Sequence, residues 1–103
     1  GYNVEEALAD LDFIHSPLTV RSWRAGDLFA CARGLRKVKA LLLERRIPPE
    51  QRRLWPVVVS AGQVVWMRGF GVALPFRRKL PTAAAVWIEE VGMRDEGDGN
   101  PAD

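Results

Sequence analysis

Two consecutive prolines, Pro48-Pro49, place the firmest limit on how this chain folds. A residue before proline is pushed out of the helical region of backbone space, so a helix must end by Ile47. From Gly34 to that point, apolar residues recur at a spacing that places them on one face of a helix. These residues are Leu35, Val38, Leu41 and Leu42. Pro49 and Glu50 suit the first turn of another helix. The sequence therefore predicts a helix from about residue 34, the proline pair, and a short helix over residues 49–54.

Extended segments are predicted on both sides of this helical region. Residues 18–22 alternate between apolar and polar side chains, and a shorter extended piece follows around Leu28-Phe29. Two runs rich in valine, 57–59 and 64–67, flank Ser60-Ala61-Gly62 and predict a hairpin. Gly69 and Gly71 indicate a bulge or bend, and a last strand is expected within residues 82–91. The prediction is an α+β fold, a small single domain of short antiparallel or mixed strands with a helix–ProPro–helix segment.

The charge is distributed unevenly along the 103 residues. The formal net charge is only +2, but residues 17–88 hold 14 Lys and Arg against three acids, a formal +11. Residues 1–16 carry four acids and no Lys or Arg, and residues 89–103 carry six acids and one Arg. We interpret 1–16 as a connector or a first, partly ordered segment, 17–91 as the domain and 92–103 as a flexible acidic tail. A basic centre of this size attracts a polyanion; a merely solubilising surface is the alternative.

Residues that could perform catalysis or bind a metal are scarce. One histidine, His15, and one cysteine, Cys31, leave too few ligands for a structural zinc site. The sequence contains no Gly-rich phosphate loop, and no Ser–His–acid or Cys–His set can be assembled from it. We therefore expect no catalytic residue, no metal and no cofactor in this chain. No apolar run approaches the roughly 18 residues of a membrane helix, so a cytoplasmic protein without a membrane partner is expected.

The basic residues of the central region are the candidate functional residues. Lys and Arg spread over a helix flank and the adjacent turns can neutralise successive phosphates of RNA. Arg also suits bidentate phosphate contacts. The predicted RNA-binding residues are Arg21, Arg24, Arg36, Lys37, Lys39, Arg45, Arg46 and Arg52. Seven aromatic residues lie among them and could stack on unpaired bases, but a core position is the preferred interpretation for each. They are Trp23, Phe29, Trp55, Trp66, Phe70, Phe76 and Trp87.

The order of short motifs resembles the C-terminal domain of tRNA(Ile)-lysidine synthetases. Residues 20–29, VRSWRAGDLF, are similar to that family's R-x-R-x-x-G-D-R-F segment. Residues 34–39, GLRKVK, and 42–48, LLERRIP, resemble its G-x-K-K-L-K and L-I-D-R-K-I-P motifs. Arg52, the 55–59 run WPVVV, Val64-Val65-Trp66, Gly69 and Phe76-Arg77 continue the match in order. The sequence departs from the pattern where Leu28, Leu54 and Gly71 replace usual basic residues. RNA contacts at these positions are then either lost or moved to the less typical Arg33, Arg53 and Arg78.

This resemblance implies a fold and a function. The fold would be a small α+β domain shared with part of the phenylalanyl-tRNA synthetase beta chain. The domain would help to hold tRNA by its acceptor stem. A separate N-terminal catalytic domain would use ATP and lysine to convert the wobble cytidine of an isoleucine tRNA to lysidine. Its partners would thus be tRNA and that catalytic domain, and this chain alone would not be an enzyme.

Two other interpretations remain open on the sequence. The domain could serve mainly to pack against its neighbours. Alternatively, the basic helix could dock on an acidic protein partner or form a homodimer, and an exposed apolar patch beside the basic surface would favour that function.

Overall fold

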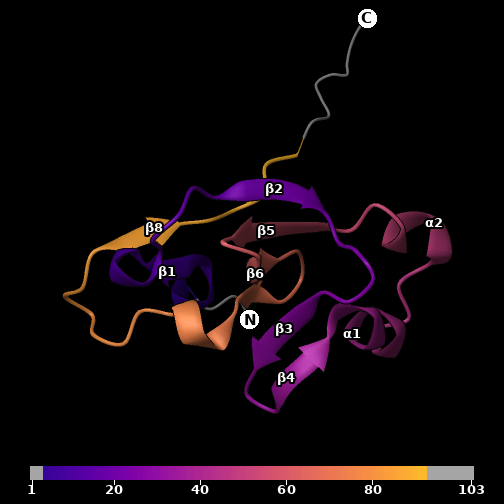
Figure 1. Cartoon of the computed structure of the whole chain (residues 1–103), viewed down its shortest axis with the longest axis horizontal. Helices are drawn as coiled ribbons and strands as arrows, with labels where there is room; N and C mark the ends of the chain where they lie inside the picture. The colour runs from indigo at the N-terminus through magenta and orange to yellow at the C-terminus, as the bar shows by residue number, and fades with distance from the viewer. Residues whose placement is uncertain (1–3, 93–103) are drawn as a thin grey trace, which may run out of the picture.

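The computed structural model describes residues 4–92, and short strands form most of its regular structure (Figure 1). In chain order the strands are β1 (Leu8–Asp10), β2 (Thr19–Ser22), β3 (Leu28–Cys31), β4 (Gly34–Lys37), β5 (Pro56–Ser60), β6 (Gln63–Met67), β7 (Gly71–Val72) and β8 (Ala85–Trp87). The α-helices are α1 (Val38–Glu44) and α2 (Pro49–Arg52), and the 3-10 helices are η1 (Val4–Ala7), η2 (Leu11–Phe13) and η3 (Leu74–Phe76). The predicted α+β fold with a helix–ProPro–helix segment is confirmed.

The strands pair antiparallel in three small sheets. The largest has the order β2-β5-β6-β7, and β3-β4 and β1-β8 form two-stranded sheets. Strand β5 lies inside the largest sheet, and its residues Val57, Val58 and Val59 are all at most 9% exposed. Because successive side chains of a strand point to opposite faces, both faces of β5 are covered. This double burial explains why the sequence there is a continuous valine run instead of an alternating one.

The β5–β6 hairpin has the predicted position and a two-residue turn. Ala61 and Gly62 both adopt positive φ, at 50° and 79°, as a type I′ turn requires. Val59 pairs with Val64, but Val58 pairs with Trp66, so Val65 is an extra residue in β6. Such a bulge bends the strand and increases its local twist.

Residues 34–37 form a strand, and their predicted place in the first helix was therefore wrong. They form β4, which pairs with β3 so that Phe29 lies opposite Arg36 and Leu28 opposite Lys37. Gly34 has a φ of 103°, which suits the tight connection between the two strands. Leu35 was expected on the buried helix face and is instead 65% exposed. Pairing with β3 satisfies the backbone of this segment without a helix, and helical periodicity alone could not reveal that partner.

The helix that remains, α1, turns its predicted apolar face to the core. Val38 and Leu42 are fully buried and Leu41 is 5% exposed. They belong to one apolar cluster with buried residues of β3, β5, β6 and β7. Burying side chains of this size stabilises a fold by about 1.5–3 kcal/mol each. The same cluster therefore fixes α1 against the sheet and determines where its charged flank points.

The N-terminal segment contributes to this packing. Strand β1 pairs with β8, the backbone N–H of Ile88 donates to the Ala7 carbonyl at 2.8 Å, and Ala9 is fully buried in the core cluster. Residues 4–10, part of the segment interpreted as a connector or a first, partly ordered segment, thus contribute to the packed structure. Nearly all of the predicted acidic tail, residues 93–103, lies outside the described residues. Within residues 4–92, no helix is long and apolar enough to span a membrane.

The aromatic residues follow the core interpretation with one exception. Phe29, Trp55 and Phe76 are buried, and Trp23, Trp66 and Phe70 are partly buried against the core. Trp87 is 48% exposed, and its assignment to the core was therefore wrong. It belongs to β8, which pairs on one side with the short strand β1 and leaves this ring uncovered.

Candidate nucleic-acid interface

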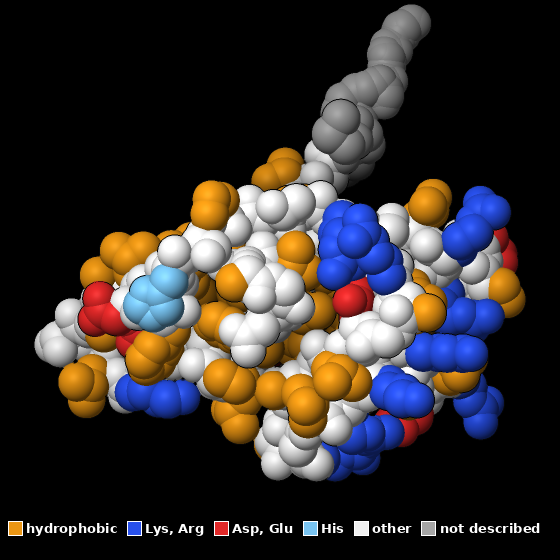
Figure 2. Space-filling view, viewed as in Figure 1, with side chains coloured by type: hydrophobic (Ala, Val, Ile, Leu, Met, Phe, Trp, Pro, Cys, Tyr) orange, Lys and Arg blue, Asp and Glu red, His pale blue; other side chains and the backbone are white. Residues whose placement is uncertain are grey.

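Lys and Arg side chains gather at the end of the molecule formed by α1 and α2 (Figure 2). A further basic group lies beside the end of β2, and acidic side chains with the single histidine are visible at the opposite end. The charge asymmetry of the sequence is therefore also an asymmetry in space. We call the α1–α2 end with the adjoining end of β2 the basic end.

Backbone geometry at the end of α1 places Arg46 on this surface. The N–H of Ile47 donates to the Leu42 carbonyl at 3.2 Å, and the N–H of Arg46 to the Leu43 carbonyl at 3.0 Å. This pair of bonds is the Schellman pattern, in which the residue after the C-cap Arg45 is left-handed and usually glycine. Arg46 occupies that position with a φ of 56°. An arginine is thus held in a conformation that residues with a side chain disfavour.

Arg21 is tied into a structural ion pair. Its guanidinium donates to both carboxylate oxygens of Asp27, at 2.8 and 3.1 Å, and the Asp27 carboxylate also accepts the Arg24 backbone N–H at 2.8 Å. The hydrogen bonds from Arg21 lower the pKa of Asp27, and the same contact raises the pKa of Arg21. The side chains of Arg21 and Asp27 are only 18% and 13% exposed, and their pairing stabilises the turn between β2 and β3. Arg21 is therefore poorly placed to contact a phosphate.

Arg36 is also part of an ion pair, with an acid of α1. It forms an ion pair with Glu44 of α1, and Arg33 reaches the same carboxylate at 3.1 Å. The hydrogen bond from Arg36 is the main cause of the lowered pKa of Glu44. One carboxylate shared by two arginines leaves a net positive charge at this point of the surface.

Arg45 and Arg52 hold loops together while remaining at the basic end. Arg45 donates to the Gly69 carbonyl at 2.9 Å, and its guanidinium lies 4.0 Å from the centroid of the Phe70 ring. Arg52 donates to the Ile47 carbonyl at 3.0 Å, and its own carbonyl accepts the Trp23 indole N–H at 2.6 Å. The second arrangement connects α2 to the end of β2 and brings these two parts of the basic end together.

The other four predicted residues are exposed: Arg24, Lys37, Lys39 and Arg46. Within residues 4–92, none of their side chains has a hydrogen bond or ion pair with another side chain. The eight predicted residues thus divide into four that stabilise the fold and four whose charges face solvent. Sequence reasoning could not make this division, because the acids that engage Arg21 and Arg36 lie six and eight positions away.

The three arginines expected to replace missing basic residues have different positions. Arg53 is exposed beside α2 and extends the basic end. Arg33 shares Glu44 with Arg36, as described above. Arg78 lies elsewhere in the fold, where it donates to Glu5 at 2.8 Å and to the Pro81 carbonyl at 3.0 Å. Arg78 therefore joins the N-terminal segment to the loop before β8.

Metal ligands are not grouped in the part of the chain that the structure describes. No set of three or more His, Cys, Asp or Glu side chains there could hold a metal ion. His15 is exposed, and the thiol of Cys31 lies 3.4 Å from the Gly34 carbonyl. The chemistry that the basic end offers is electrostatic attraction and hydrogen-bond donation to anions.

Comparisons with known proteins place the chain in a family. Residues 18–89 match the model of the family described as the TilS substrate C-terminal domain. The chain is 33% identical over 95 residues to the tRNA(Ile)-lysidine synthase of Solibacter usitatus, covering 90% of this chain and 22% of the relative. It is 34% identical over 97 residues to the enzyme of that name from Symbiobacterium thermophilum, covering 92% and 20%. The chain thus spans about a fifth of the length of these relatives.

The fold leads to the same family. A crystal structure of a TilS C-terminal domain superposes with a TM-score of 0.64 at 29% identity, covering 74% of this chain and 61% of the other. The matched residues contain the helix–ProPro–helix segment and the β5–β6 hairpin, which position the basic end. On sequence and on fold, the chain belongs to the family of TilS substrate C-terminal domains, the C-terminal domains of tRNA(Ile)-lysidine synthases.

Proposed function

We propose that this chain is a tRNA-contacting domain of a tRNA(Ile)-lysidine synthase and that its basic end contacts the tRNA acceptor stem. In this proposal a separate N-terminal domain in the bacterial cytoplasm uses ATP and lysine to make lysidine at the wobble cytidine. This chain then supplies affinity and orientation, with no cofactor of its own. The observation that supports the proposal most directly is the set of four solvent-facing cations at the basic end, Arg24, Lys37, Lys39 and Arg46.

The distribution of these charges suits a nucleic-acid backbone. Arg24 extends from the β2–β3 turn, Lys37 and Lys39 from the β4–α1 junction, and Arg46 from the end of α1. Charges on several elements match the spaced phosphates of a helical stem better than a single small anion. The paired arginines Arg21, Arg36, Arg45 and Arg52 contribute to the field and hold these elements in place. A-form RNA presents phosphates and 2′-hydroxyls, so we expect recognition of shape and little readout of sequence.

A titration of the chain with an isoleucine tRNA transcript tests the proposal. Each neutralised phosphate of a duplex lowers the logarithm of the association constant by about 0.9 per decade of salt. Four contacts therefore predict an affinity loss of roughly 100-fold between about 50 and 200 mM salt. Undetectable binding at low salt, or an affinity that salt does not change, would contradict the proposal.

Comparing charge reversal at the basic end with charge reversal elsewhere tests whether this end binds the tRNA. Lys37→Glu with Lys39→Glu removes two proposed phosphate contacts, so the salt slope should fall by about two. The matched control is Lys79→Glu, because Lys79 is also exposed but follows η3, away from α1 and α2 (Figure 1). An equal loss of affinity from Lys79→Glu would mean that overall charge, and not the basic end, determines binding.

A protein-docking function for the same end has its own supporting observation. Leu35 of β4, Leu43 of α1 and Leu54 in the turn after α2 are 65%, 49% and 63% exposed. Exposed leucines beside cations would suit a homodimer or an acidic protein partner. Sedimentation of the chain with and without Leu54→Ser and Leu43→Ser separates the two functions. A dimer that these changes dissociate, together with undisturbed tRNA binding, would assign the leucines to protein contact.

A further inference from the structure

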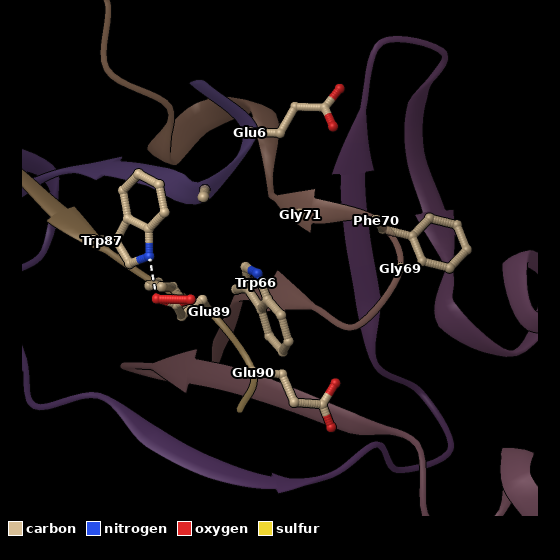
Figure 3. A pocket seen from close by; sticks show the side chains of 10 residues that line it. Glu6, Trp66, Gly69, Phe70, Gly71, Trp87, Glu89 and Glu90 are labelled. Carbon is tan, nitrogen blue, oxygen red and sulfur yellow. Dashed lines mark hydrogen bonds between the residues drawn. The ribbon is translucent and has the colours of Figure 1, made fainter. Parts of the chain in front are cut away.

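A pocket outside the basic end has the opposite chemical character. It has a volume of about 410 Å³ and lies between η1, the β6–β7 connection and the segment from β8 onward. Its lining contains three acids and two tryptophans but no Lys or Arg (Figure 3). These five residues are Glu6, Trp66, Trp87, Glu89 and Glu90. We call it the acidic pocket.

Two indole rings form its aromatic walls. Trp87 is 48% exposed, and its indole N–H donates to a Glu89 carboxylate oxygen at 2.9 Å. Trp66 is half-buried and lies across the pocket from it (Figure 3). The hydrogen bond fixes the position of the Glu89 carboxylate relative to the ring. Ring faces carry negative charge density, so aromatic walls beside carboxylates form an environment that attracts cations.

The carboxylates of the pocket are only partly neutralised. Glu90 is bound by Arg68, whose Nε donates at 2.7 Å, and these hydrogen bonds lower the pKa of Glu90. Glu6 and Glu89 have no Lys or Arg partner among residues 4–92. The pocket therefore carries two uncompensated negative charges in a chain with a basic centre. A phosphate backbone would be repelled from it.

We propose that the acidic pocket binds an arginine side chain presented by a protein segment. A guanidinium is planar, always charged and weakly hydrated, so it can stack on an indole while donating to carboxylates. The ammonium of lysine is more strongly hydrated and fits the same charges less well. The pocket, at about 410 Å³, lies within the size range of small-molecule sites and has room for a guanidinium and part of its aliphatic stem. This binding is independent of tRNA contact and uses other residues.

The test is a titration of the 103-residue chain with short peptides, followed by NMR of the indole N–H signals. The probes are the N-acetylated amides of Gly-Arg-Gly and Gly-citrulline-Gly, because citrulline keeps the shape of arginine and lacks its charge. We expect the arginine peptide to shift the Trp66 and Trp87 signals saturably, with a dissociation constant on the order of millimolar. The citrulline peptide should bind at least about fivefold more weakly. Equal binding of the two peptides would overturn the proposal.

Variants locate the binding. Glu89→Gln removes one charge and Trp87→Ala removes one exposed wall, and each should weaken arginine-peptide binding by about threefold to tenfold. The matched control is Glu50→Gln, which removes an exposed acid of α2 at the basic end. Thermal melts confirm that each variant is folded. Unchanged peptide binding by both pocket variants would overturn the proposal, as would an equal loss in the control. A parallel tRNA titration of the two pocket variants, Glu89→Gln and Trp87→Ala, should show no change, so failure of either proposal can be recognised separately.

Discussion

Arg21 and Asp27 are joined by two side-chain hydrogen bonds across the turn between β2 and β3. The same carboxylate accepts the backbone N–H of Arg24, so one acid fixes both the arginine and the turn. This arrangement makes Arg21, one of the predicted RNA-binding residues, a structural residue. It also separates the effects of mutations on stability from their effects on binding.

Replacement of Asp27 by asparagine is expected to lower the free energy of unfolding by about 2 kcal/mol, because it leaves the largely buried Arg21 charge unpaired. The pKa of Asp27 is lower in the fold than its ordinary value of 3.8. The pair therefore stabilises the fold above that value, and its contribution is lost as pH falls through the lower folded value. Urea unfolding at pH 7 and at pH 2–3 measures this. If the difference in free energy of unfolding between the wild type and Asp27→Asn were as large at pH 2–3 as at pH 7, this explanation would be contradicted.

Arg46→Gly separates strain from charge at the end of α1. Glycine adopts the φ of 56° without the penalty that arginine has, so unfolding should require up to about 1 kcal/mol more free energy. The same variant should bind tRNA several-fold more weakly, because an exposed cation is gone. Thermal melts measure the change in stability, and the tRNA titration measures the change in affinity. Arg46→Lys is the control, since it keeps the charge, and it should retain binding.

Gly71→Ala is expected to destabilise the fold more than Gly62→Ala. Both glycines have positive φ, at 81° and 79°, so the backbone penalty is similar. A Cβ at residue 71 would lie 2.7 Å from the Glu6 carbonyl oxygen, whereas one at residue 62 meets nothing within 4 Å. We expect Gly62→Ala to lower the free energy of unfolding by about 1 kcal/mol, from φ alone, and Gly71→Ala to lower it by at least twice that amount. Equal losses in urea unfolding would mean that η1 moves away from β7 without cost.

Ala61→Asn should stabilise the β5–β6 hairpin. Ala61 has a φ of 50° at the first position of a type I′ turn that ends with Gly62, and asparagine tolerates this conformation better than alanine. The expected gain is about 0.5 kcal/mol in the free energy of unfolding. Ala61→Val, which is β-branched and disfavours positive φ, should have the opposite effect. The two variants together distinguish turn conformation from side-chain size.

The sequence by itself determined the elements whose signal is local. Pro48-Pro49 required the first helix to end before them and predicted the start of α2. Val38, Leu41 and Leu42 marked the buried face of α1, and the valine runs predicted β5 and β6. The charge asymmetry and the ordered motifs identified the family and the basic candidate residues. These properties depend on neighbouring residues, because proline sterics and helical spacing act over a few positions.

Tertiary structure alone decided what depends on residues distant in the chain. Residues 34–37 form a strand because β3 offers a pairing partner, although their spacing fits a helix. Arg21 and Arg36 are engaged because Asp27 and Glu44 face them, whereas Lys37 and Lys39 face solvent. The acidic pocket unites residues from both halves of the chain. Strand pairing, charge compensation and pockets are contacts in space, and a single sequence does not record which distant residues will meet.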